Sequence, residues 1–264
     1  MKYIIAIVVL SLATTASFAQ DSVSYKQLEN VVLEYPLLYQ QTAAEYRALC
    51  YQAFNTAAMR LNAIPARKIR KQKLAIITDL DETILDNSYS DGQLIKEGKQ
   101  YNSASWKNWT DRSAATAVPG AVDFLNQAHN KGISIFYVSN RNPAAIGTTL
   151  INLRKLQLPD ADSAHCYFQT DSSSKESRRQ IVMGQYTVIM LLGDNLNDFM
   201  NVFEHGNIAE RFKQTDNQRE QWGNKFIVLP NATYGEWENA IYNYKRGLTP
   251  QQREAIRVSL LQGY

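Results

Sequence analysis

Cysteine and histidine are scarce in this sequence of 264 residues, and this scarcity limits the chemistry that the chain can perform. The two cysteines, Cys50 and Cys166, are too few for a disulfide framework or a cysteine-based zinc site. The three histidines lack the spacing of metal ligands. Export would permit a disulfide between the two cysteines, and the sequence leaves open whether their sulfur atoms meet.

A strong charge of one sign and long biased tracts are also absent. The formal net charge is +3, and one of these charges, Lys2, lies in a segment that we expect to be removed. So weak a charge predicts no binding of polymeric nucleic acid. With 12 glycines, 7 prolines, 45% hydrophobic residues and 20% charged residues, the composition is typical of a globular protein. The length favours one core domain with a modest accessory segment.

Residues 1–19 have the order of regions that is typical of a secretory signal peptide. A positive start at Lys2 is followed by an apolar run over residues 3–12 and by small residues that end at Ala19, the expected cleavage point. The apolar run is shorter than the ~20 residues that a membrane-spanning helix needs. The alternative interpretation of residues 1–19 is a buried N-terminal helix instead of a signal peptide. Because no cysteine lies near the cleavage point to accept a lipid, we expect an exported, periplasmic or secreted protein without a stable membrane anchor.

The mature chain is expected to contain a helical N-terminal segment and a larger core domain. The N-terminal segment covers residues 20–70, and its apolar side chains recur at helical spacing from about residue 38 to residue 61. The basic run at residues 67–73 is interpreted as a solvated connector. The core domain covers residues 71–264, with an inserted helical and aromatic segment at about residues 87–118.

Short apolar runs alternate with helical patterns throughout the core domain. Strands are predicted at residues 74–78, 133–138, 187–192 and 226–229, and helices at residues 119–130, 148–158, 175–184, 234–244 and 250–261. This alternation predicts an α/β fold, in which a Rossmann-like parallel sheet carries helices on both faces beside a small, mainly helical accessory domain. In such sheets ligands bind beyond the carboxyl ends of the strands.

Polar residues lie at these expected strand ends and at the start of one helix. They are Asp79 and Asp81 after the first strand, Ser139 and Asn140 after the second, Lys175 at a helix start, and Asp194 and Asp198 after the third strand. An aspartate after a strand is often only a turn or cap residue, but the joint arrangement is much rarer by chance. Crowded carboxylates repel one another and favour a hard divalent cation such as Mg²⁺. Together with hydroxyl, amide and lysine donors, they describe a site where a carboxylate attacks a tetrahedral anion.

Four longer motifs carry a resemblance to a known family. They are residues 79–88 (DLDETILDNS), 138–141 (VSNR), 193–199 (GDNLNDF) and 229–237 (LPNATYGEW). With Lys175, they resemble the haloacid dehalogenase-like (HAD) hydrolase superfamily, and within it the class C acid phosphatases, the family of the bacterial outer-membrane 5′-nucleotidase lipoprotein. The resemblance covers the chain from about residue 38 to its end. It also implies that the protein forms a homodimer. The lipid-acceptor cysteine of that lipoprotein is missing here.

This resemblance implies roles for the acidic residues. Asp79 would be the nucleophile that forms an aspartyl-phosphate, and Asp81 would protonate the leaving group and then activate water. The Asp79 carboxylate, the backbone carbonyl of Asp81 and Asp194 would hold Mg²⁺. Asp198 would orient Lys175 or a metal-bound water without binding the ion directly.

The resemblance also implies which residues hold the substrate. Ser139, Asn140 and Lys175 would bind the phosphoryl oxygens. An aromatic pair, assigned to Tyr234 and Trp106, would stack on a nucleobase or another planar leaving group.

Other residues near these motifs have either a functional or a structural interpretation. Asn87 contacts the entrance of the site or serves as a turn residue. Large aromatic side chains are more often core residues than ligand contacts, and this alternative is preferred for Trp109 and Trp237. Arg141 is interpreted as structural.

The residue two positions after Asp79 distinguishes the chemistries of the superfamily. Ion-pumping ATPases carry threonine there and dehalogenases lack an acid, so Asp81 favours rapid hydrolysis of a phosphomonoester; the alternative is that Asp81 only caps the turn. We therefore predict an exported, Mg²⁺-dependent acid phosphatase for small phosphomonoesters, including nucleoside 5′-monophosphates. The other hypotheses are a phosphotransferase that uses the same residues and a non-catalytic nucleotide-binding surface protein.

Overall fold

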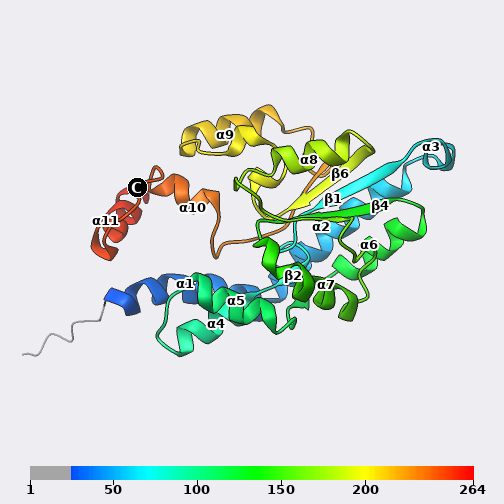
Figure 1. Ribbon diagram of the computed structural model, residues 1–264. Coiled ribbons are helices and arrows are strands. Elements are labelled where there is room, and N and C mark those ends of the chain that lie inside the picture. Colours follow the sequence, from blue (N-terminus) through cyan, green and yellow to red (C-terminus); the bar gives the residue numbers. More distant parts are fainter. Residues whose placement is uncertain (1–24) are drawn as a thin grey trace, which may run out of the picture.

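The computed structural model describes residues 25–264, and the expected signal peptide at residues 1–19 lies outside this part of the chain. A five-stranded parallel sheet forms the centre, in the order β5-β4-β1-β6-β7 (Figure 1). Its strands are β1 (Leu74–Thr78), β4 (Ser134–Val138), β5 (Cys166–Tyr167), β6 (Thr187–Gly193) and β7 (Phe226–Val228). The predicted α/β fold with a parallel sheet is confirmed.

Helices cover both faces of the sheet because its central strand is apolar on both sides. All five residues of β1 are buried. Since successive side chains of a strand point to opposite faces, Leu74 and Ile76 join one apolar core and Ala75 and Ile77 join a second. The helices that pack on one face are α2 (Ala44–Asn62), α6 (Ala121–Asn130) and α7 (Ile146–Lys155), and α8 (Glu176–Met183) packs on the other. The carboxyl ends of the strands therefore remain open to a ligand.

The N-terminal helical segment consists of two long helices, whereas its apolar spacing predicted one. They are α1 (Tyr25–Thr42) and α2, and the extended backbone of Ala43 separates them. The buried stripe of α2 follows the predicted spacing, at Tyr46, Cys50, Phe54, Ala57 and Leu61. Leu49, an apolar residue of the same helix, is exposed. The basic run forms a short helix, α3 (Ala66–Lys71), that has no buried residue.

A helical cap lies beside the carboxyl edge of the sheet and comes from three distant parts of the chain. The strands β2 (Leu85–Asp86) and β3 (Thr116–Ala117) pair with each other. Along the chain, the helices α4 (Ser88–Lys96) and α5 (Ser103–Asp111) lie between these two strands. The N-terminal helix α1 contacts both α4 and the C-terminal helix α11 (Pro250–Leu260). Figure 1 shows α1 beside α4. We call α1, α4, α5 and α11 the cap.

The remaining elements are short. They are the helices α9 (Ile208–Asn217) and α10 (Glu236–Ile241) and the 3-10 turns η1 (Pro143–Ala145), η2 (Leu196–Asp198) and η3 (Asn201–Phe203). In the described part of the chain, no helix is both long and apolar enough to cross a membrane. Cys50 and Cys166 are both buried as free thiols, so no disulfide joins them.

Candidate active site

The strand ends and the cap enclose a cleft of about 940 Å³, and nearly all of the predicted site residues line it. These are Asp79, Asp81, Asn87, Trp106, Asn140, Lys175, Asp194, Asp198 and Tyr234. Ser139 is fully buried next to the cleft, with its hydroxyl 3.4 Å from a carboxylate oxygen of Asp81. The fold thus brings together every residue that the sequence analysis selected for the site, although their roles stay predictions.

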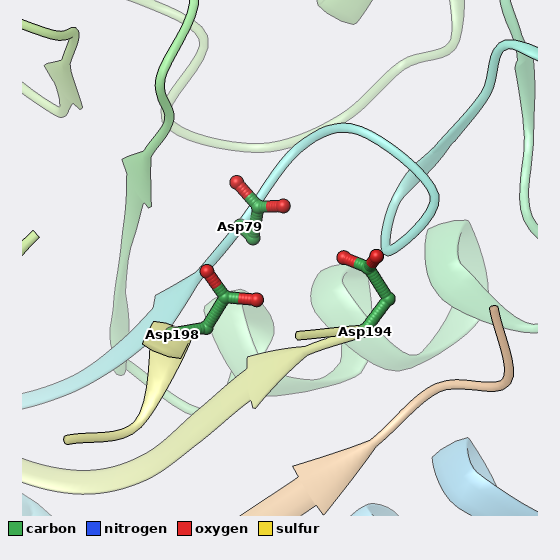
Figure 2. A group of neighbouring side chains, drawn as sticks. All are labelled: Asp79, Asp194 and Asp198. Carbon is green, nitrogen blue, oxygen red and sulfur yellow. The ribbon is translucent and has the colours of Figure 1, made fainter. Parts of the chain in front are cut away.

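Three carboxylates gather at the floor of the cleft. Asp79 follows β1, Asp194 follows β6 and Asp198 belongs to η2, and oxygen atoms of all three lie within 4.8 Å of one another. Figure 2 shows the three side chains next to one another beyond the strand ends. The close approach depends on Gly193, because a Cβ atom at that position would lie 2.4 Å from the Asp198 carboxylate.

Lys175 joins two members of this cluster. Its ammonium group lies 2.5 Å from Asp79 Oδ1 and 2.6 Å from Asp198 Oδ1, and the side chain is buried. Burial alone would lower the pKa of Lys175, but the adjacent carboxylates of Asp198 and Asp79 outweigh it and raise the pKa. A permanent positive charge is therefore present beside the predicted nucleophile.

The positive charge of Lys175 does not balance the negative charge of the three carboxylates. Burial raises the pKa of Asp79 well above its usual range, in spite of Lys175, and the neighbouring carboxylates raise it further. Burial, with the charge of Asp198, also raises the pKa of Asp194 to about 6. These shifts mean that the site lacks positive charge when all the acids are ionised. A divalent cation with a preference for oxygen ligands fits this donor set.

Asp81 lies apart from the cluster and is held by other groups. Arg141 donates to its carboxylate through Nη2 at 2.7 Å and through Nε at 3.0 Å, and Asn87 donates through Nδ2 at 2.9 Å. Trp109 fixes Asn87 in turn, since its indole N–H donates to Asn87 Oδ1 at 2.8 Å. The Asp81 side chain is therefore oriented beside Asp79 without taking part in the acidic cluster.

Arg141 and Trp109 contact site residues that the sequence analysis did not connect to them. Arg141 was interpreted as structural, but its guanidinium binds Asp81 and lies 5.6 Å from the centre of the Trp106 ring. Trp109 packs against the larger core as expected and also reaches the site through Asn87. Trp237, which was expected to pack, is exposed and lines the cleft.

Glu82 is a buried acid that sequence reasoning missed. Its carboxylate accepts a hydrogen bond from the Tyr234 hydroxyl and another, of 3.0 Å, from the backbone N–H of Asn87. Burial and the nearby charge of Asp81 raise the pKa of Glu82, and burial also raises the pKa of Tyr234. Glu82 has a φ of +58°, which turns the chain sharply after Asp81. The sequence pointed to Glu82 only through its position inside the first motif, residues 79–88.

Two further hydrogen bonds fix Asp194. The hydroxyl of Thr83 donates to Oδ1 at 3.0 Å, and the Asn231 amide donates to Oδ2 at 2.8 Å. Thr83 and Asn231 belong to the first and last motifs, but the sequence did not show that both meet the same carboxylate. Both oxygens of Asp194 are thus oriented before any ligand binds.

Gly193→Ala tests whether the close approach of the carboxylates matters. We expect divalent cations to bind at least roughly tenfold more weakly, because the added methyl group displaces Asp198 from the cluster. The measurement is calorimetric titration of the purified protein with Mg²⁺. Gly147→Ala in α7 is the control, since its Cβ would meet no atom within 4 Å. Equal Mg²⁺ affinity in Gly193→Ala and wild type would contradict this account.

Comparison with known proteins identifies the family of this chain. Two solved structures of the class C acid phosphatase from Bacillus anthracis, one with tungstate bound, are 35% identical in sequence to this chain. They cover 90% of this chain and 99% of their own, with TM-scores of 0.84 and 0.85. The family model of the HAD superfamily, subfamily IIIB (acid phosphatase), matches residues 6–237. The chain therefore belongs to the subfamily IIIB acid phosphatases of the HAD superfamily and is a phosphomonoester hydrolase.

Proposed function

We propose that this enzyme is a Mg²⁺-dependent acid phosphatase that hydrolyses phosphomonoesters, among them nucleoside 5′-monophosphates, through an aspartyl-phosphate on Asp79. The observation that carries the proposal is the buried carboxylate of Asp79, which lies at the end of β1, in contact with Lys175 and close to the carboxylates of Asp194 and Asp198. An oxygen atom at this point can reach a phosphoryl group in the cleft.

The reaction has two steps that use the same pair of aspartates. In the first, an Asp79 oxygen bonds to phosphorus, the bond from phosphorus to the ester oxygen breaks, and Asp81 donates a proton to the departing oxygen. In the second, water attacks phosphorus, Asp81 takes its proton, and the bond between phosphorus and Asp79 breaks. Arg141 and Asn87 donate to the Asp81 carboxylate and fix its orientation, which supports its role as the base in the second step.

The proposed metal site consists of the Asp79 and Asp194 carboxylates and the backbone carbonyl of Asp81. When bound, Mg²⁺ neutralises the repulsion between the attacking carboxylate and the phosphate. The raised pKa values of Asp79 and Asp194 support this site, since a cation beside them would favour the ionised form of both acids. Asp198 binds Lys175 and thereby orients it.

Ser139, Asn140 and Lys175 hold the phosphoryl oxygens. The Bacillus anthracis relative binds tungstate, a tetrahedral oxyanion like phosphate, which supports oxyanion binding by this family. The three donors come from two loops at the same edge of the sheet, and Asn140 and Lys175 line the cleft. Donors arranged around a phosphoryl group stabilise the charge that develops during transfer.

The nucleoside part of a substrate lies farther out, against Tyr234 and Trp106. Both rings line the cleft, and Glu82 fixes the Tyr234 hydroxyl so that the ring remains exposed to the cleft. Asn87 links this region to Asp81. The wide cleft leaves room for a leaving group larger than a simple alcohol.

Export follows from the order of regions in residues 1–19 and places the enzyme in the periplasm or outside the cell. Its substrates are then small phosphomonoesters outside the cytoplasm. N-terminal sequencing of the protein from its native host tests export. A mature N-terminus at Gln20 is expected, and an intact Met1 would contradict cleavage.

Asp79→Asn tests the nucleophile. We expect phosphate release to fall by at least about a thousandfold, because the amide keeps the shape of the side chain but cannot attack phosphorus. The measurement is phosphate release from nucleotides, sugar phosphates and aryl phosphates with Mg²⁺, repeated with EDTA, which should abolish wild-type activity. Asp123→Asn, an exposed acid on α6, is the control. Near-normal activity in Asp79→Asn would refute the assigned role.

Tyr234→Ala tests recognition of the nucleobase. Loss of one stacking ring should raise KM for nucleoside monophosphates by roughly tenfold, and it should change KM for small aryl or sugar phosphates much less. Tyr234→Phe is the matched control, since it keeps the ring and removes only the hydroxyl that binds Glu82. An equal rise for all substrates would make Tyr234 a packing residue.

A further inference from the structure

Arg178 is a buried residue on α8, and its guanidinium group lies between two loops of the phosphate site. Its Nη1 donates to the backbone carbonyl of Ser139 at 2.6 Å. Its Nη2 donates to Asn140 Oδ1 at 2.7 Å and to the backbone carbonyl of Ser174 at 2.9 Å. One side chain therefore ties the loop that follows β4 to the loop that precedes Lys175.

The contact with Asn140 decides which way its amide group faces. A guanidinium group has only donors, so the Asn140 atom that faces it must be the carbonyl oxygen. The NH₂ group of the same amide then points away from Arg178. Because the Asn140 side chain is exposed and lines the cleft, these N–H donors are available to an anion there.

We propose that Arg178 is a positioning residue that fixes the Asn140 amide with its NH₂ group toward the phosphate. The proposal rests on the proposed function, in which Asn140 holds a phosphoryl oxygen. Without Arg178 the amide can rotate by 180° and present its oxygen atom, which repels a phosphoryl oxygen. Arg178 itself lies behind Asn140 and acts through it.

A comparison of Asn140→Ala with Asn140→Asp tests whether the outer atom of the Asn140 side chain faces the phosphate as a donor. Both are measured as the Kd of inorganic phosphate by calorimetry in the presence of Mg²⁺. Asn140→Ala loses the donor, and we expect about tenfold weaker binding, which corresponds to about 1.4 kcal/mol. Asn140→Asp still accepts from Arg178 but turns a negative oxygen atom toward phosphate, so its binding should be weaker again by about tenfold or more. Binding by Asn140→Asp as tight as by Asn140→Ala would overturn the proposal.

A double-mutant cycle tests whether Arg178 acts through Asn140. Arg178→Lys keeps the charge but lacks the planar fork that binds two acceptors. We expect it to weaken phosphate binding by about tenfold in the wild-type background and by less than about twofold in Asn140→Ala. KM for phosphate esters should change by the same factors, with smaller changes in kcat. Equal losses in both backgrounds would overturn the proposal.

Arg211→Lys controls for the replacement of a buried arginine. Arg211 donates to the backbone carbonyl of Phe203 and contacts neither phosphate loop through a described hydrogen bond. It should lower the melting temperature without changing the phosphate Kd. The Asn140 comparison keeps the test decisive if Arg178→Lys does not fold, because Asn140 is exposed.

The two proposals fail in different ways. A wild-type enzyme that neither binds phosphate nor releases it from any ester would overturn the proposed function and this inference together. A wild-type enzyme that binds phosphate and hydrolyses esters, but whose Asn140 and Arg178 variants lose affinity independently, would overturn this inference alone.

Discussion

Three carboxylates whose oxygens lie within 4.8 Å of one another cannot all remain ionised without a compensating positive charge. Lys175 supplies one such charge and contacts two of the three acids directly. The donor set that remains suits a divalent cation. The arrangement also explains why position 193 is glycine, since any larger residue would displace Asp198. The chemistry of the site thus follows from a charge imbalance that the fold maintains.

Several side chains of the cleft are held in place by hydrogen bonds from a second residue. Arg141 and Asn87 orient Asp81, Thr83 and Asn231 orient Asp194, and Arg178 orients Asn140. Buried hydrogen bonds of this kind restrict rotation before a ligand arrives. The cost of ordering the site is therefore met during folding rather than during each turnover.

The cap and the sheet contribute different parts of the cleft. The ends of β1, β4 and β6 and the start of α8 carry the acids and the proposed phosphate donors, whereas α1, α4, α5 and α11 form the outer walls. Glu82 joins the two regions, because it follows Asp81 in the catalytic turn and accepts from Tyr234 in the outer cleft. One turn of the chain thus connects the acidic cluster with the outer part of the cleft.

The sequence by itself determined the parallel sheet and the residues at its edge, because a buried strand such as β1 requires a continuous apolar run and its polar end is visible as Asp79. It missed β5, which has only two residues, and the break at Ala43, which interrupts no apolar spacing. Only the tertiary structure decided that Arg141, Glu82 and Arg178 serve the site, and that α1 and α11 meet in the cap. The physical reason is that their partners lie far away along the chain, and no local pattern records such contacts.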